Sequence, residues 1–123
     1  MASSGLRDRR ILIVEDEYLI AMSLRDVLEG AGSVVVGPVP NVEKAIKTIE
    51  SEPSLDAAVV DVNLGGKLAY PVADLLLARN IPFVFTSGYE DDTLRTRYPQ
   101  VINCHKPYIF PKMEEALARA LQR

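Results

Sequence analysis

Short apolar runs alternate with helix-like segments along the whole chain, and this alternation restricts the possible folds more than any other feature of the sequence. The first run, residues 11–14, is apolar throughout, as expected for a strand that is covered on both faces. Further runs rich in apolar and β-branched residues follow at 34–36, 57–60, 83–85 and 101–102. Each run precedes a segment with helical periodicity. Short connections between the two kinds of element favour one parallel sheet with helices on both faces.

The predicted helices differ in strength. Most carry a clear apolar stripe. The segment 90–98 is the exception, because Leu94 and Tyr98 are its only large apolar residues. We therefore expect a weakly formed, mobile helix there, ended by Pro99.

Length and composition indicate one folded domain. The chain has 123 residues and a net charge of −3, and a single cysteine, Cys104, excludes an internal disulfide. We therefore expect a cytoplasmic protein. No run reaches the ~20 apolar residues needed to cross a bilayer. The acidic balance argues against nucleic-acid binding, which depends on lysine and arginine at the phosphates.

Polar residues follow four of the five predicted strands. Because the carboxyl ends of parallel strands meet at one edge of a sheet, we expect these residues to lie together. They are Glu15, Asp16 and Glu17 after the first strand, Asp61 and Asn63 after the third, Thr86, Ser87 and Gly88 after the fourth, and His105 and Lys106 after the fifth.

These residue types indicate a particular chemistry. Clustered carboxylates repel one another unless a cation joins them, and oxygen ligands alone favour Mg²⁺ over zinc. A lysine and hydroxyl groups beside them suit the oxygens of a phosphoryl group. The sequence therefore predicts a magnesium and phosphoryl site built around a carboxylate. Glu17 is interpreted only as a residue of the first helical turn, where an acidic side chain is favourable.

Four motifs resemble, in order and spacing, the receiver domain of two-component response regulators. They are residues 11–17, residues 61–64, Ser87 with Gly88, and Lys106 with Pro107. The resemblance covers about residues 9–123. It implies a flavodoxin-like (βα)5 fold with a five-stranded parallel sheet in the order 2-1-3-4-5. The receiver domain would then be residues 10–123, preceded by a flexible tail, residues 1–9.

The resemblance also implies roles for the site residues. Asp61 would accept a phosphoryl group from the phosphohistidine of a histidine kinase. The carboxylates of Asp16 and Asp61 and the main-chain carbonyl of Asn63 would hold Mg²⁺, with Glu15 acting directly or through water. Lys106 would pair with the phosphoryl oxygens.

A hydroxyl group would report the phosphorylation. We prefer Ser87 over Thr86, because the hydroxyl residue of the family directly precedes the small residue, here Gly88, whose backbone would also contact the phosphoryl group. Residues 85–89 further resemble a Phe-Ala-Thr-Gly-hydrophobic-Tyr motif found in single-domain alphaproteobacterial receivers, with Thr86 in the alanine place. Many receivers have an aromatic residue where this chain has Asn103. Our hypothesis is that Tyr89 takes over that readout, together with the segment 90–98.

Two features receive no chemical role. Gly65 and Gly66 lack the Lys-Ser/Thr of a phosphate-binding P-loop, so we expect a flexible turn. His105 is a lone histidine, and we interpret it as a surface side chain.

Two alternatives to a phosphoryl-accepting receiver remain. A haloacid-dehalogenase-type phosphohydrolase also uses Mg²⁺ and a strand-end aspartate, but it places Asp-x-Asp after its first strand, whereas Asp61 and Asn63 follow the third. The second alternative is a receiver that binds its partners without being phosphorylated.

The preferred interpretation is a signalling protein rather than a turnover enzyme. Because no residues follow the last predicted helix, we expect the signal to pass by contact with another protein, or the domain to act as a phosphate sink. The expected partners are a histidine kinase and either a histidine phosphotransfer protein or a downstream target. The expected state is a monomer or a weak dimer.

Overall fold

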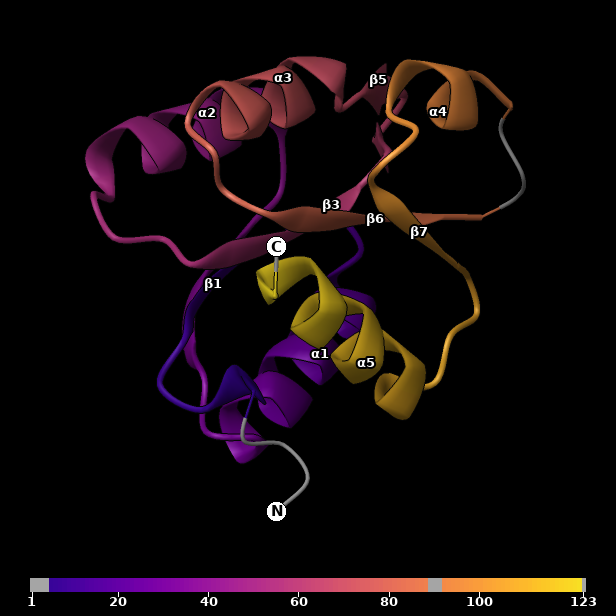
Figure 1. Ribbon diagram of the computed structural model, residues 1–123. Coiled ribbons are helices and arrows are strands. Elements are labelled where there is room, and N and C mark those ends of the chain that lie inside the picture. Colours follow the sequence, from indigo (N-terminus) through magenta and orange to yellow (C-terminus); the bar gives the residue numbers. More distant parts are fainter. Residues whose placement is uncertain (1–4, 89–91, 123) are drawn as a thin grey trace.

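A computed structural model describes residues 5–88 and 92–122 of the chain and shows one parallel sheet between two layers of helices (Figure 1). Within the described residues, five strands form this sheet in the order β2-β1-β3-β6-β7. Counted along the main sheet alone, this is the predicted order 2-1-3-4-5. The strands are β1 (Arg10–Val14), β2 (Val34–Val39), β3 (Ala57–Asp61), β6 (Phe83–Ser87) and β7 (Ile102–His105).

The helices cover both faces of the sheet, as predicted. One face carries α1 and α5, and the other carries α2, α3 and α4 (Figure 1). Their bounds are α1 (Tyr18–Gly30), α2 (Val42–Ser51), α3 (Tyr70–Ala78), α4 (Asp92–Arg97) and α5 (Phe110–Leu121).

Alternating residues of the central strands enter two separate cores. Leu12 and Val14 of β1 pack in the core under α2 and α3, whereas Ile11 and Ile13 pack in the core under α1 and α5. Every residue of the central strands β3 and β6 is buried. This is why these strands are continuous apolar runs that end in polar residues only where the sheet ends.

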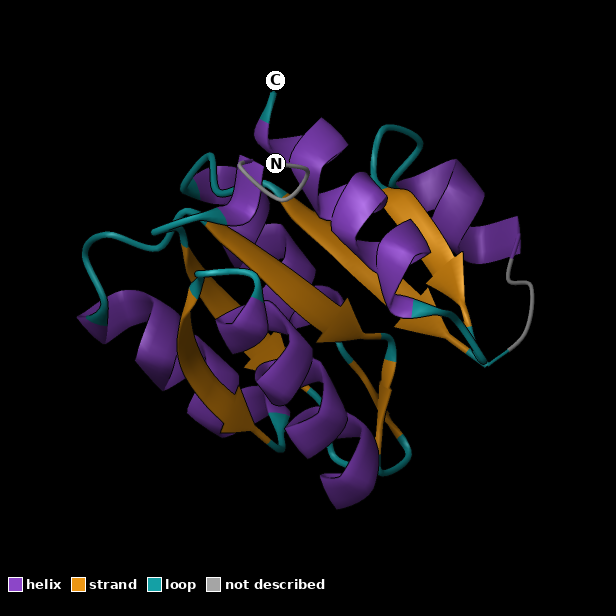
Figure 2. Cartoon of the chain, turned by 90° about the horizontal axis from the view of Figure 1, so that it is seen from below, coloured by secondary structure: helices purple, strands orange, loops and turns teal. Residues whose placement is uncertain are grey.

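A short hairpin, which was not predicted from the sequence, follows β3. It consists of β4 (Asn63–Leu64) and β5 (Lys67–Leu68), and Figure 2 shows it outside the main sheet. Gly65 and Gly66 form its turn with φ angles of 63° and 94°. A two-residue hairpin turn of this kind requires positive φ at both positions, which glycine adopts without strain. The predicted turn is therefore confirmed.

The N-terminal segment contributes to the core. Leu6 is fully buried in the core under α1 and α5. The Ser33 hydroxyl donates to its carbonyl oxygen at 2.8 Å, and the amide of Asp8 donates to the Gly32 carbonyl at 2.8 Å. The predicted division into a tail, residues 1–9, and a domain, residues 10–123, stays a prediction, but Leu6 packs with the domain.

Helix α4 is short, and aromatic contacts attach it to α3. Of the predicted segment 90–98, the structure forms α4 over Asp92–Arg97, and residues 90–91 lie outside the described residues. The buried Tyr98 donates a hydrogen bond to Asp74 Oδ1 at 2.7 Å. The guanidinium of Arg97 lies 4.6 Å from the centre of the Tyr70 ring.

Within the described ranges, the structure contains no helix with the length and apolar character that crossing a membrane requires.

Candidate functional site

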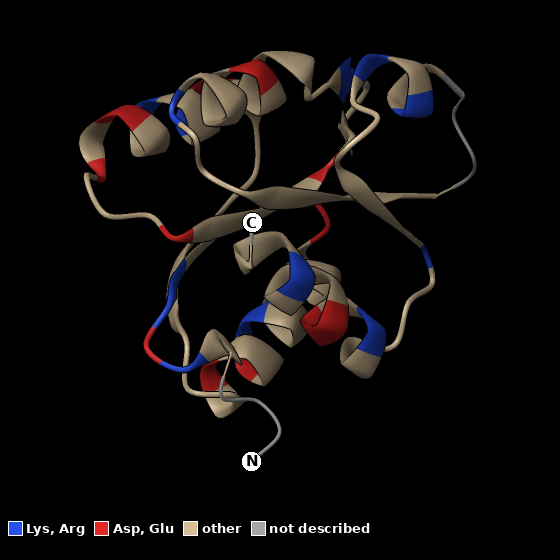
Figure 3. Cartoon of the chain, in the orientation of Figure 1, with Lys and Arg blue, Asp and Glu red and all other residues tan. Residues whose placement is uncertain are grey.

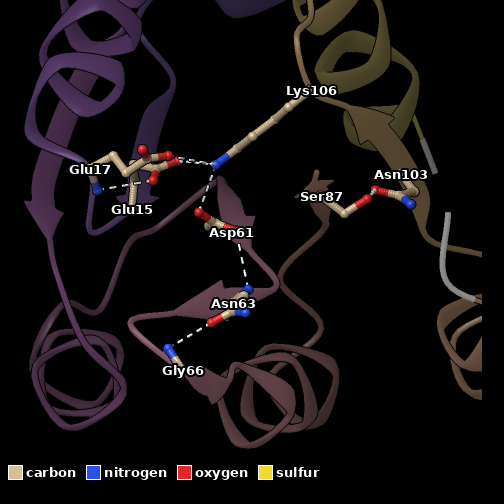
Figure 4. Close-up of polar contacts among 8 residues, drawn as sticks. All are labelled: Glu15, Glu17, Asp61, Asn63, Gly66, Ser87, Asn103 and Lys106. Carbon is tan, nitrogen blue, oxygen red and sulfur yellow. Dashed lines mark hydrogen bonds and ion pairs between the residues drawn. The ribbon is translucent and has the colours of Figure 1, made fainter. Parts of the chain in front are cut away.

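The carboxyl edge of the sheet brings the predicted site residues together. Glu15 directly follows β1, Asp61 ends β3, Ser87 ends β6 and Lys106 directly follows β7. The amide of Lys106 donates to the Ser87 carbonyl at 2.7 Å, which extends the sheet pairing to the lysine. Figure 3 shows the acidic segments at the ends of β1 and β3 beside each other, and Figure 4 shows the side chains.

The ammonium group of Lys106 lies among three carboxylates. Its Nζ is 2.8 Å from Asp61 Oδ2, 3.3 Å from Glu15 Oε1 and 3.6 Å from Glu17 Oε1 (Figure 4). The contact between Lys106 and Glu17 was not predicted, because Glu17 was interpreted only as an acidic residue at the start of a helix. Burial by itself lowers the pKa of Lys106, but the hydrogen bond to Asp61 and the charges of Asp61 and Glu15 outweigh it. The net pKa is raised, so the lysine is charged at neutral pH.

The two oxygens of Asp61 have different partners. Oδ2 faces Lys106, and Oδ1 accepts a hydrogen bond from the amide of Asn63 at 3.1 Å. The Asn63 side chain in turn accepts a hydrogen bond from the Gly66 amide at 2.7 Å, so the hairpin turn keeps Asn63 in place beside Asp61 (Figure 4). This arrangement fixes the orientation of a carboxylate that is only 5% exposed.

Glu15, Asp16 and Asp61 form the predicted acidic cluster. One carboxylate oxygen from each lies within 4.8 Å of the other two. Burial, followed by the hydrogen bond with Asp61, raises the pKa of Glu15 to about 7. Two buried carboxylates and an exposed one at this separation form an all-oxygen donor set, which fits a hard divalent cation such as Mg²⁺. The cluster therefore meets the donor requirement of the predicted metal site.

The two candidate hydroxyl groups have different surroundings. The Ser87 hydroxyl donates to Asn103 Oδ1 at 3.1 Å, which directs it towards β7 (Figure 4). Thr86 is 1% exposed, and its Oγ1 has no hydrogen-bond partner among the described residues. Sheet register places Thr86 between Asp61 and Cys104. The Ser87–Asn103 hydrogen bond was not foreseen, because Asn103 was considered only as a missing aromatic residue.

The remaining candidates lie at the edge of the site. Gly88 is exposed, and a Cβ atom added to it would meet no described residue within 4 Å, so these residues leave the space beside its backbone open. His105 is exposed, as predicted for a surface side chain. Tyr89, the predicted readout residue, lies outside the described residues.

An apolar groove, which was not predicted from the sequence, adjoins the site. Its volume is about 520 Å³, and Lys106 and Pro107 form part of its wall. Leu19, near the start of α1, also lines this groove and is 79% exposed, whereas the neighbouring Tyr18, at 72% exposure, does not line it. The other lining residues are Ile20, Ser23, Leu24, Val27, Tyr108 and Phe110.

Comparisons with known proteins identify the fold and the family. No profile of a known protein family matches the chain. The solution structure of SdrG from Sphingomonas melonis Fr1 is 43% identical, with a TM-score of 0.80, and the match covers 98% of this chain and 99% of SdrG. A response regulator receiver protein from Sinorhizobium medicae WSM419 is 25% identical, with a TM-score of 0.85, over 95% of this chain and 97% of that one.

A curated relative agrees with these structures. The phyllosphere-induced regulator PhyR of Methylorubrum extorquens is 33% identical over 115 residues, which are 90% of this chain. The chain spans only 43% of the length of that PhyR. The relatives are response regulators, which are signalling proteins and not turnover enzymes. The chain therefore belongs to the receiver-domain family of the response regulators of two-component signalling.

Proposed function

We propose that Asp61 accepts a phosphoryl group from the phosphohistidine of a histidine kinase and that this modification carries the signal. The observation that supports the proposal most is the Lys106 ammonium, 2.8 Å from an oxygen of the buried Asp61. It lies at a sheet edge where two further carboxylates converge. A phosphohydrolase of the haloacid-dehalogenase type is not supported. Such an enzyme places Asp-x-Asp after its first strand, whereas Asp61 ends the third strand along the chain and is followed two residues later by Asn63 instead of a second aspartate.

The chain's own residues would position and neutralise the reacting groups. A carboxylate oxygen of Asp61 forms a bond to phosphorus while the bond from phosphorus to the imidazole nitrogen breaks, and the histidine leaves with the electron pair of that bond. Lys106 keeps its proton and offsets the charge of the phosphoryl oxygens. Transfer through a loose transition state needs little beyond this positioning and charge neutralisation.

Glu15, Asp16 and Asp61 would hold Mg²⁺, together with the main-chain carbonyl of Asn63. When bound, the ion would neutralise phosphoryl oxygens and bring them against the Asp61 carboxylate. The raised pKa of Glu15 supports this assignment, because a carboxylate that is costly to ionise alone gains a partner when a cation binds.

Ser87 and Gly88 would complete the phosphoryl site. The Ser87 hydroxyl ends β6 at the same edge as Asp61, and the open space at Gly88 leaves room for phosphoryl oxygens beside its backbone amide. We prefer Ser87 over Thr86, since the Thr86 hydroxyl is enclosed in the sheet with 1% exposure. The Tyr89 hypothesis stays a prediction.

The partners of the chain would be other proteins. The exposed Leu19 and the groove beside Lys106 offer an apolar surface to a protein phosphodonor that must reach Asp61. The output would be contact with a further protein, transfer to a histidine phosphotransfer protein, or phosphate withdrawal from a shared kinase. A cytoplasmic location and a monomeric or weakly dimeric state stay predictions.

The test is incubation with candidate histidine kinases and labelled ATP. We expect transient, stoichiometric labelling of the wild type with Mg²⁺, and none of Asp61→Ala. Mg²⁺ alone should also raise the melting temperature of the wild type by mass action, and Asp61→Ala should lose most of this response. Steady turnover of p-nitrophenyl phosphate, or a wild type indifferent to both kinase and Mg²⁺, would contradict the proposal.

A further inference from the structure

The hydrogen bond between Ser87 and Asn103 joins the phosphoryl site to β7. In the sheet, Ser87 pairs with His105 and Phe85 pairs with Asn103, so Asn103 lies two residues before the partner of Ser87. The Ser87 hydroxyl donates to Asn103 Oδ1 at 3.1 Å, and Ser87 is 6% exposed. The bond is therefore partly buried, and it links β6, which pairs with the strand of Asp61, to β7 at the edge of the sheet (Figure 4).

This hydrogen bond competes with the proposed phosphoryl contact. A serine hydroxyl has a single proton to donate. While that proton is directed to Asn103, it is unavailable to an oxygen of a phosphoryl group on Asp61. Forming the phosphoryl contact therefore requires the hydroxyl to turn away from β7, and the Asn103 carbonyl loses its donor.

Asn103 also borders a cavity on the α4 side of the sheet. The cavity has a volume of about 210 Å³, and its lining includes Phe85, Leu94, Arg95, Tyr98, Asn103 and His105. Leu94 and Arg95 belong to α4, and Tyr98 directly follows it. If the Asn103 side chain loses the Ser87 hydroxyl as its donor, its amide oxygen would accept a hydrogen bond from another donor on the α4 side of this cavity.

We propose that Asn103 is a positioning residue that holds the Ser87 hydroxyl away from Asp61 in the unmodified chain and, when a phosphoryl group draws the hydroxyl away, passes the change to the cavity under α4. The inference rests on the proposed function, because it requires a phosphoryl group on Asp61. In this chain the amide oxygen of Asn103, a hydrogen-bond acceptor, would serve at the position where many receivers have an aromatic residue.

Beryllofluoride with Mg²⁺, a mimic of the phosphoryl group, provides the test. Asn103→Leu keeps the approximate size of the side chain and removes the acceptor, so the hydroxyl no longer has to break a hydrogen bond to residue 103. We expect it to bind beryllofluoride about two- to tenfold more tightly than the wild type, the range that one net hydrogen bond allows. Asn103→Asp retains an acceptor and should show no gain.

A double-substitution cycle separates this role from a general effect on the fold. In a Ser87→Ala background, Asn103→Leu should leave the affinity unchanged, because the hydroxyl through which Asn103 acts is gone. Cys104→Ala is the matched control, since it alters the neighbouring residue of β7, whose side chain faces the other core. Asn103→Ala in the same cycle repeats the test with a smaller side chain, and thermal melts verify that each variant is folded.

The possible results distinguish the two proposals. Equal affinity of Asn103→Leu and the wild type, or an equal gain with and without Ser87, would overturn the role of Asn103 and leave Asp61 as the phosphoryl acceptor. A folded wild type that binds no beryllofluoride would overturn the proposed function, and the inference with it.

Discussion

Lys106 and Asp61 lie 45 positions apart in the chain, and their side chains meet at 2.8 Å across the end of β6. The lysine is 18% exposed and the aspartate side chain 6%, so this is a largely buried ion pair. Removing one partner of such a pair leaves an uncompensated charge, which costs more than the pair itself contributes. Here the removal of the lysine would leave Glu15 as a second unpaired carboxylate beside Asp61.

Lys106→Met should therefore destabilise the metal-free protein. We expect the free energy of unfolding at pH 8 with a chelator present to fall by about 3 kcal/mol, as for other broken buried pairs. Adding Asp61→Asn to this variant should recover part of the loss, because it removes one of the two repelling carboxylates. Denaturant unfolding of the four proteins of this cycle measures both effects. Strict additivity of the two substitutions would show that the side chains do not interact.

Glu15 should make the stability of the metal-free protein depend on pH. Its pKa is about 7 in the folded chain and about 4.5 as a free side chain, so the folded state binds the extra proton between these values. Stability must then fall as the pH rises through this window, by up to about 3 kcal/mol at 1.4 kcal/mol per pKa unit. Urea unfolding at pH 5, 6, 7 and 8 with a chelator measures the slope.

The control for this prediction is Glu15→Gln, which cannot ionise. Its free energy of unfolding should vary less with pH, and it should exceed that of the wild type at pH 8. A wild type that becomes more stable from pH 5 to pH 8, with no difference in Glu15→Gln, would contradict the burial effect assigned to this carboxylate.

Thr86→Val should stabilise the chain. The Thr86 hydroxyl is buried and has no hydrogen-bond partner among the described residues, and valine has nearly the same shape. Removing a buried polar group without a partner should add about 1 kcal/mol to the free energy of unfolding. Thr48→Val is the control, because the exposed Thr48 hydroxyl donates to Lys44 O at 2.7 Å. A loss of stability in Thr86→Val would indicate that this hydroxyl is satisfied.

Leu19→Asp should slow phosphoryl transfer from a protein donor but not from a small-molecule donor. The side chain is 79% exposed at the start of α1, so the substitution has little effect on folding. We expect transfer from a histidine kinase to fall at least tenfold, the loss of about 1.4 kcal/mol from one apolar contact. Labelling by the small donor acetyl phosphate should be unchanged.

Leu77→Asp, at a residue of α3 that is 40% exposed, is the matched control and should transfer normally from both donors. Equal slowing of both donors by Leu19→Asp would place the effect at Asp61 itself, and no slowing with the kinase would exclude this surface from docking.

Most of the fold could be predicted because its signals are local. Apolar runs that end in acidic residues or hydroxyls mark buried strands that reach the carboxyl edge, as in β1, β3 and β6. Leu6 was assigned to the tail because a single apolar residue next to Arg7 has no periodicity to identify it. Its burial depends on α1 and α5, which are distant in the sequence. The β4–β5 hairpin was missed because each strand has only two residues.

The site was predictable in its composition but not in its contacts. The position of Asp61, Glu15 and Lys106 at strand ends predicted that they would meet. The pairing of Ser87 with Asn103 was not predictable, because it depends on the register of β6 against β7. The contact of Glu17 with Lys106 likewise depends on where the long lysine side chain reaches, which strand order alone does not determine.

The most direct test of the central claim is the location of the phosphoryl group after transfer from a histidine kinase. We expect one group per chain, on the peptide that contains Asp61, with the lability to hydroxylamine that an acyl phosphate shows. A phosphoryl group on the single histidine, His105, would instead be stable in base and would be lost in acid. Label on His105, or undiminished labelling of Asp61→Ala, would rule out Asp61 as the phosphoryl acceptor.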